Sequence, residues 1–249
     1  MTIWQKLGVG FAVLATLSAL PKMGFAADAA HPTVVELFQS QGCSSCPPAE
    51  ANVAAVSDRP DVLALAFEVD YWDRLGWKDT FSKHAWTERQ YAYARAFARD
   101  GVYTPQVVVN GQTQVTGSDS RAVQDAIARA ATAQLASVGI TLTSSQTVSF
   151  RISKLPPGSH ESEILLAVTE GGLSTPVGGG ENVGHTLRHA AVVRTLTSLG
   201  KLDPKYPGEY TADARLNLRP EWVRANVKLV LMLQDRVTRR ILGAATVKL

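Results

Sequence analysis

Apolar residues follow two different patterns along the chain. Between about residue 31 and residue 136, short apolar runs of strand length alternate with segments rich in good helix formers. After residue 137, short runs with a period of two are separated by turns rich in Gly and Pro. The first pattern is typical of an α/β layer, and the second favours a sandwich-like all-β unit. We therefore expect two parts, residues 27–136 and residues 137–249, with the second packed on the first.

The first part is expected to run strand, helix, strand, helix, hairpin, helix. Asp79 is a candidate N-cap for the second helix and Gly101 a candidate stop. Asn110 and Gly111 give the strongest hairpin signal in the chain. The pattern predicts strands over residues 33–38, 61–69, 106–110 and 113–116, and helices over residues 49–56 and 81–100 and from Ser118 or Asp119 to Gln134.

The second part is expected to contain short strands without intervening helices. Its apolar runs cover residues 140–144, 148–155, 163–169, 188–197, 227–234 and 241–249. The glycine-rich loop over residues 171–184 could cover a site, although such a loop is more often only a connection.

The first 26 residues have the pattern of a secretory signal peptide. Lys6 precedes an uncharged run over residues 7–20, and a small residue stands on each side of Phe25, so cleavage is expected after Ala26. The run is shorter than the roughly 20 residues that a bilayer core requires. We expect a periplasmic or secreted protein that is not stably inserted in the membrane after cleavage.

Composition excludes several classes of protein. With 45% hydrophobic and 19% charged residues and only two cysteines, the chain is neither intrinsically disordered nor a cysteine-stapled miniprotein. Removing residues 1–26 leaves 223 residues with 23 bases against 22 acids and no long basic run. We therefore expect no nucleic-acid partner and no polybasic membrane patch.

The two cysteines, Cys43 and Cys46, lie at a predicted strand-to-helix turn. A thiolate near a helix N-terminus is stabilised by unpaired backbone N–H groups, so the pKa of Cys43 is expected to be lowered. Cys46 is placed to resolve a mixed disulfide. A purely structural disulfide in an exported protein is the alternative that these residues leave open.

A second segment, Thr104-Pro105 followed by an apolar strand and Asn110-Gly111, resembles the thioredoxin superfamily, especially glutaredoxins. The resemblance implies a thioredoxin-like α/β fold with an inserted helical segment. It also implies a cis Pro105 against the cysteine turn and a Thr104 backbone that pairs with a substrate peptide. By the same resemblance Glu36 is a candidate buried acid that accepts the proton of Cys46, although it could instead point outward or bond to backbone.

Longer motifs are similar to the exported bacterial family called domain of unknown function 1223. They are VELFQSQGCSSCPPAE at residues 35–50, VDYWDRLGWKD at 69–79, YTPQ at 103–106, GEN at 180–182, and LQD and LGAA at 233–235 and 242–245. This resemblance covers nearly all of the mature chain and implies a thioredoxin-like fold with an added C-terminal β domain. Glu68 and Ala191 stand where a His and an Asn of the family are expected, so no role is carried over to them.

Aromatic side chains gather after the second predicted strand. Tyr71, Trp72 and Trp77 could line a substrate groove beside the cysteine turn, or they could be buried between the two parts.

His185 and His189 share one face of a predicted strand. Together with the two cysteines they are candidate ligands for copper or zinc. Neither histidine has a metal-ligand spacing to the cysteine pair, so we predict no metal site and no cofactor.

The leading hypothesis is an exported thiol–disulfide oxidoreductase or redox carrier that acts on protein or peptide thiols and disulfides. In it, the Cys43 thiolate attacks, Cys46 resolves, and Thr104 and Pro105 hold the substrate. The alternatives are a non-catalytic binding module with a structural disulfide and, third, a copper- or zinc-binding protein.

Overall fold

The computed structural model describes residues 31–131, 133 and 135–249, so the predicted signal peptide lies outside it. Within the described part, no helix is long and apolar enough to cross a membrane.

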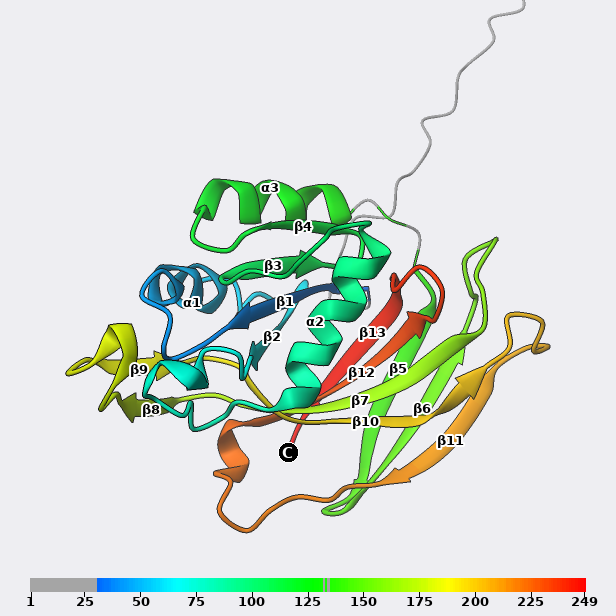
Figure 1. Cartoon of the computed structure of the whole chain (residues 1–249). Coiled ribbons are helices and arrows are strands. Elements are labelled where there is room, and N and C mark those ends of the chain that lie inside the picture. The colour runs from blue at the N-terminus through cyan, green and yellow to red at the C-terminus, as the bar shows by residue number, and fades with distance from the viewer. Residues whose placement is uncertain (1–30, 132, 134) are drawn as a thin grey trace, which may run out of the picture.

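Two parallel strands with alternating faces organise the first half of the chain (Figure 1). Val35 and Leu37 of β1 pack toward α1 and α3, whereas Val34 and Phe38 pack toward α2, because successive side chains of a strand point to opposite faces. The elements are β1 (Thr33–Gln39), α1 (Cys46–Ala54), β2 (Val62–Glu68), η1 (Asp73–Leu75), α2 (His84–Ala96), β3 (Gln106–Val109), β4 (Thr113–Thr116) and α3 (Ser120–Ala130).

Local signals placed most of these elements correctly. Asn110 and Gly111 join β3 to β4 with positive φ angles of 47° and 62°, as a tight hairpin turn requires. The side chain of Asp119 accepts a hydrogen bond from the backbone N–H of Ala122 and caps α3. Helix α3 ends at Ala130, and Gln134, to which the prediction extended it, lies outside the described residues.

Helix α1 begins at Cys46, so its first turn includes Pro47 and Pro48, which are tolerated there because a first turn needs no backbone donors. The predicted start of the second helix is wrong. Helix α2 begins at His84 with Lys83 at the N-cap, so Asp79 does not cap it. Asp79 instead accepts hydrogen bonds from the backbone N–H groups of Gln41 and Phe81.

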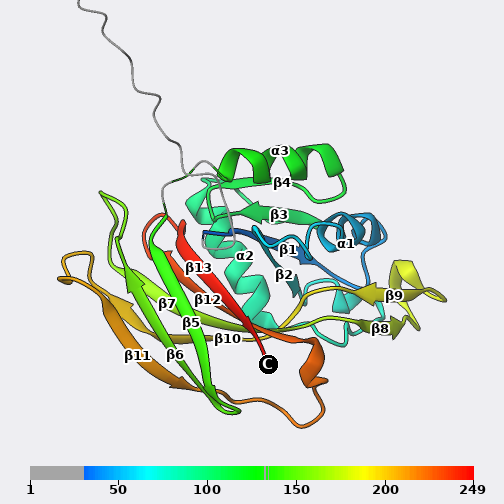
Figure 2. The same ribbon diagram turned by 180° about the vertical axis from the view of Figure 1, so that it is seen from behind.

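The second half contributes nine strands. They are β5 (Ser137–Ser144), β6 (Thr147–Ser153), β7 (Ser162–Glu170), β8 (Leu173–Pro176), β9 (Thr186–His189), β10 (Val192–Leu202), β11 (Tyr210–Arg215), β12 (Val227–Asp235) and β13 (Ile241–Lys248), with short helical turns η2 (Gly180–Asn182) and η3 (Arg224–Asn226). Strands β11, β6 and β5 form a three-stranded sheet, and β8 and β9 form a separate hairpin (Figure 2). Side chains from β6, β7 and β12 share one apolar core, so the three-stranded sheet packs on the second-half strands of the larger sheet.

The predicted fold class, a thioredoxin-like α/β unit plus a separate sandwich-like β unit, is contradicted. One eight-stranded sheet runs through both halves in the order β13-β12-β7-β10-β2-β1-β3-β4. Strands hold 41% of the described residues, so the protein is mostly β. The two halves join where Val192 of β10 pairs in parallel with Ala66 of β2. All seven residues of β2 are buried, because α2 packs on one face of the strand and α1 on the other. A domain boundary near residue 137 stays a prediction.

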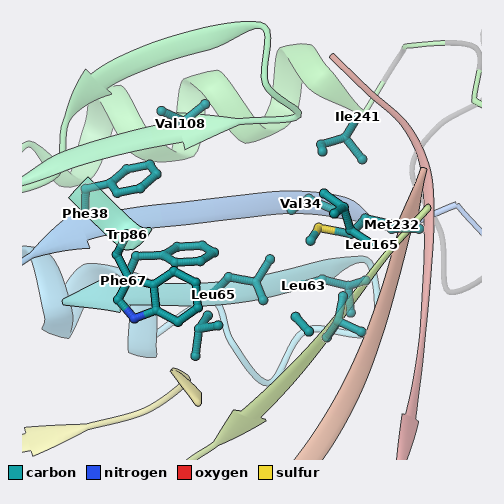
Figure 3. Packing of buried hydrophobic residues seen from close by; sticks show 14 of the residues in the cluster. Val34, Phe38, Leu63, Leu65, Phe67, Trp86, Val108, Leu165, Met232 and Ile241 are labelled. Atoms are coloured by element: carbon teal, nitrogen blue, oxygen red, sulfur yellow. The ribbon is translucent and has the colours of Figure 1, made fainter. Parts of the chain in front are cut away.

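A single apolar core on the α2 face crosses the junction between the halves (Figure 3). Phe67 of β2 packs edge-on against Trp86 of α2 with ring centroids 5.2 Å apart. Leu165 and Met232, from strands of the second half, belong to the same cluster as Val34. Burial of this shared surface makes the two halves depend on each other for stability.

Candidate functional site

The Cys43–Cys46 disulfide lies at the N-terminus of α1, just after β1 ends. The Cα atoms of the two cysteines are 5.5 Å apart, and the residues are 0% and 2% exposed. Ser45, at the N-cap of α1, makes no side-chain capping bond. In the first turn the Cys46 N–H donates to Cys43 O over 3.2 Å, and Pro47 and Pro48 have no N–H, so the helix acts on the sulfur atoms through its dipole.

Cys43 is contacted by the segment that the sequence associated with it. Thr104 Oγ1 donates a hydrogen bond to Cys43 Sγ over 3.3 Å, and Trp72 Nε1 donates to Thr104 Oγ1 over 2.8 Å. The Ser45 hydroxyl also lies 3.3 Å from the Cys43 sulfur. The Thr104–Pro105 peptide bond is cis, as predicted. The structure therefore brings Cys43, Thr104, Pro105 and Trp72 together, and their substrate-binding and catalytic roles stay predictions.

The turn between β8 and β9 covers the cysteine loop, so the loop over residues 171–184 does more than connect strands. We call Gly180–Asn182 the tip. Asn182 Nδ2 donates to the backbone carbonyl oxygens of Gln41 and Cys43, each over 2.9 Å. The Glu181 carboxylate accepts from the Ser44 amide over 2.9 Å and from the Ser44 hydroxyl over 2.7 Å. These two hydrogen bonds from Ser44 hold the pKa of Glu181 below its usual value.

Trp77 supports the covering segment. Its Nε1 donates to Gln41 Oε1 over 3.0 Å, and a Cβ on Gly178 would lie 2.9 Å from Cζ3 of its indole ring. Tyr71 points toward α2, where its hydroxyl donates to Gln90 over 3.3 Å. Burial raises the pKa of Tyr71 to about 12. Trp77 thus packs against the covering segment, whereas Tyr71 hydrogen-bonds to α2.

Glu36 lies on the other face of the sheet and does not approach the cysteines. Arg89 of α2 donates to both of its carboxylate oxygens, over 2.6 and 3.0 Å, and the Tyr93 hydroxyl donates to it as well. Gln234 of β12 accepts from Arg89 over 3.1 Å and donates to the Tyr93 hydroxyl over 2.9 Å. Glu36 is part of a buried network that connects β1, α2 and β12.

A pocket of about 660 Å³ opens on the α1 face and reaches the buried Cys46. Its wall includes the ends of β1 and β2, the first turns of α1, and the β8–β9 hairpin, which lies beside α1 in Figure 1. The polar lining residues are Gln39, Ser40, Gln41, Glu50, Glu68, Ser174, Thr186, Arg188 and His189.

A buried acidic cluster stands in this wall, and sequence reasoning missed it. Gln39 and Glu68 are register partners at the carboxyl ends of β1 and β2, so they point to the same face, toward Glu50 of α1. Gln39 Nε2 donates to Glu50 and, over 2.9 Å, to Glu68 Oε1. His189 Nδ1 lies 3.5 Å from Glu50 Oε2. Burial raises the pKa of Glu68 well above its usual value, and the charges of Asp79 and Glu50 raise it further.

The fold separates the two histidines that the sequence suggested as candidate copper or zinc ligands. His189 is buried beside Glu50, whereas His185 is exposed near the tip. A usable signal for the cluster was present in the sequence: polar residues end two buried parallel strands, and the carboxyl ends of such strands commonly form sites.

The family described as protein of unknown function (DUF1223) matches residues 34–234. The chain belongs to this family. No curated protein matches the chain. Membership in the thioredoxin superfamily, which the sequence suggested, is not confirmed by the comparisons.

Two solved structures are similar to this DUF1223 protein. A protein from Agrobacterium tumefaciens has 29% sequence identity and a TM-score of 0.69, over 89% of this chain and 95% of that chain. HBP35 of Porphyromonas gingivalis has 14% identity and a TM-score of 0.63, over 88% of this chain and 75% of that chain, which is a likeness of fold alone. The arrangement of strands is thus found in other proteins, and the chemistry has to be argued from the side chains.

Proposed function

We propose that this DUF1223 protein is an exported thiol–disulfide exchange protein and that Cys43–Cys46 is its redox-active disulfide. The observation that carries the proposal is the hydrogen bonding of Cys43. Its sulfur accepts from Thr104, whose hydroxyl is oriented by Trp72, and it lies just before the uncapped start of α1. Hydroxyl donors and a helix N-terminus stabilise a thiolate more than a thiol, so they favour the reduced, reactive form of Cys43.

Exchange proceeds by attack of a thiolate on a sulfur of the disulfide, in either direction. When the protein oxidises a substrate, a substrate thiolate attacks Cys43 Sγ, a mixed disulfide forms, and Cys46 leaves as a thiolate. A second substrate thiolate then attacks the mixed disulfide and releases an oxidised substrate and the Cys43 thiolate. The two electrons lost by the substrate are gained by the cysteine pair.

Burial is the observation that favours the second candidate, a binding module with a structural disulfide. Both cysteines are nearly inaccessible, and Asn182 ties the tip to the cysteine loop. Exchange with a protein substrate therefore requires the segments that bury the sulfur atoms to move, whereas a structural disulfide does not.

The proposal is tested in a Cys46→Ser variant, which leaves Cys43 as a single thiol. We expect its alkylation by iodoacetamide to follow a pKa clearly below the value of about 8.5 for a free cysteine. A Thr104→Val substitution in the same background removes one donor and is expected to raise that pKa. A matched Thr80→Val substitution, at a threonine that bonds to Gln41 and not to Cys43, should leave it unchanged. A Cys43 pKa at or above 8.5, or one that does not respond to Thr104→Val, contradicts the proposal.

A further inference from the structure

The buried cluster beside the disulfide brings three metal-binding side chains to one point. Glu50 comes from α1, Glu68 from the end of β2, and His189 from the end of β9. One ligand atom of each lies within 4.8 Å of one of each of the others. The two oxygens and one nitrogen come from segments that are distant in sequence, so the tertiary fold creates the grouping.

The side-chain base that the described residues place beside these carboxylates is His189, whose Nδ1 lies 3.5 Å from Glu50 Oε2. The ion pairs of the described residues bring no lysine or arginine to Glu50 or Glu68, and Asp79 adds a third buried carboxylate next to Glu68. Carboxylates held together in a buried place are costly unless protons or a cation neutralise them.

Two buried atoms of the cluster lack a hydrogen-bond partner within the described part of the chain. They are Glu68 Oε2 and His189 Nε2, and their residues are 1% and 4% exposed. Glu68 also lies within side-chain hydrogen-bonding reach of Asp79, so a proton shared by these two carboxyl groups can satisfy one oxygen of Glu68. Buried polar atoms without a partner are rare in folded proteins, so His189 Nε2 in particular requires a partner from outside the chain. Both residues line the pocket, so a partner can reach them from solvent.

We propose that Glu50, Glu68 and His189 bind a divalent first-row transition-metal ion such as Zn²⁺, with a coordination position left toward the pocket. Two carboxylate oxygens and one imidazole nitrogen suit zinc and its neighbours better than Mg²⁺ or Ca²⁺, which prefer oxygen ligands alone. Ligand atoms about 2.0–2.1 Å from one ion lie about 3.3 Å apart in tetrahedral geometry, so separations of up to 4.8 Å must shorten by at most about 1.5 Å on binding.

Neighbouring groups already orient the three ligands. The Gln39 amide donates to both carboxylates, the Ala190 amide donates to Glu50 Oε1 over 3.1 Å, and the Phe81 ring packs edge-on against His189. Such outer contacts fix ligand orientation in metal sites. From the spacing of the histidines and cysteines, the sequence predicted no metal site. The site proposed here uses neither cysteine.

Equilibrium dialysis against Zn²⁺ tests the site in protein whose Cys43–Cys46 disulfide is intact, so that no thiolate can bind the metal. We expect one Zn²⁺ per chain, and a visible d–d absorption band when Co²⁺ replaces it. Glu68→Gln and His189→Gln should each weaken Zn²⁺ binding about 100-fold or more, and Gln39→Ala about tenfold, since outer-sphere contacts contribute 10–100-fold. The matched control is His185→Gln, an exposed histidine near the same hairpin, which should bind Zn²⁺ as the wild type does.

Wild-type protein that binds no stoichiometric Zn²⁺ overturns the proposal, and this outcome needs no variant to fold. So does an undiminished affinity in both His189→Gln and Glu68→Gln, with thermal unfolding used to confirm that they are folded. Since the disulfide form is used throughout, neither result depends on whether the cysteines exchange.

Discussion

The two faces of the central sheet each bury carboxylates, but they compensate them differently. On the α2 face, Glu36 has Arg89 bound to both oxygens and Tyr93 as a further donor. On the α1 face, Glu50 and Glu68 share the amide of Gln39, Glu50 also accepts from the Ala190 backbone N–H, and both acids line a pocket. Burial alone therefore does not distinguish a structural acid from a functional one.

The partners of each acid make that distinction. The α2-face network joins β1, α2 and β12 across the two halves of the chain, so it stabilises the shared core. The α1-face cluster instead contains the buried atoms Glu68 Oε2 and His189 Nε2, and its residues line the same pocket as Cys46. We assign a structural role to the acid on the α2 face and a functional role to the acids on the α1 face.

The largest effect is expected from Arg89→Met. The substitution leaves Glu36 buried without its cation, and breaking a buried pair in this way costs about 3–5 kcal/mol of unfolding free energy. Urea unfolding measures the loss. In a Cys46→Ser background, alkylation of Cys43 in the folded protein should be unchanged by Arg89→Met, because Glu36 lies on the other face of the sheet.

The double variant Glu36→Gln/Arg89→Met is the control for this prediction. It removes both charges and should recover part of the lost stability. A loss below about 1 kcal/mol in the single variant would mean that the α2-face pair is not the structural network described above.

A smaller effect, an increase in unfolding free energy, is expected from Glu68→Gln in chelator-treated protein. The pKa of Glu68 in the folded protein is above its ordinary value of 4.5. Between these values the unfolded chain loses the proton while the folded chain keeps it, so wild-type stability falls as pH rises above about 4.5. The variant should lack this decline and be more stable at pH 7, by about 1 kcal/mol, because it relieves one uncompensated buried group.

Unfolding of both proteins at pH 4 and pH 7 checks the prediction, and Glu36→Gln serves as the matched variant on the other face. Glu36→Gln should destabilise the protein because it leaves Arg89 buried without an anion. If the two substitutions shift stability in the same direction, the contrast between the faces fails.

Local signals in the sequence were sufficient for the elements of the first half. The strand over residues 33–38, the Asn110-Gly111 turn and the Asp119 cap each depend on residues close together in the chain. The pairing of Val192 with Ala66 joins segments more than 120 residues apart and has no local signature. The fold class was therefore wrong although many of its elements were right.

The site divides in the same way. Cys43 and Thr104 could be brought together in advance because each lies in a recognisable motif. Glu50 has the pattern of an ordinary helix acid, and Glu68 that of a residue at the end of an apolar run. Their proximity to His189 depends on the strand register, so the sequence could not predict it. Glu36 was assigned to the cysteines by resemblance to the thioredoxin superfamily, and the sequence did not fix the face of β1 on which it lies.

The reduction potential of the Cys43–Cys46 disulfide, measured by equilibration with glutathione and dithiothreitol, tests the central claim most directly. Structural disulfides of exported proteins lie below about −300 mV, where exchange partners cannot reduce them. We predict a potential above about −300 mV, which is the range in which a disulfide can exchange with substrate thiols. A potential well below that value would contradict thiol–disulfide exchange and leave the pair a structural bond.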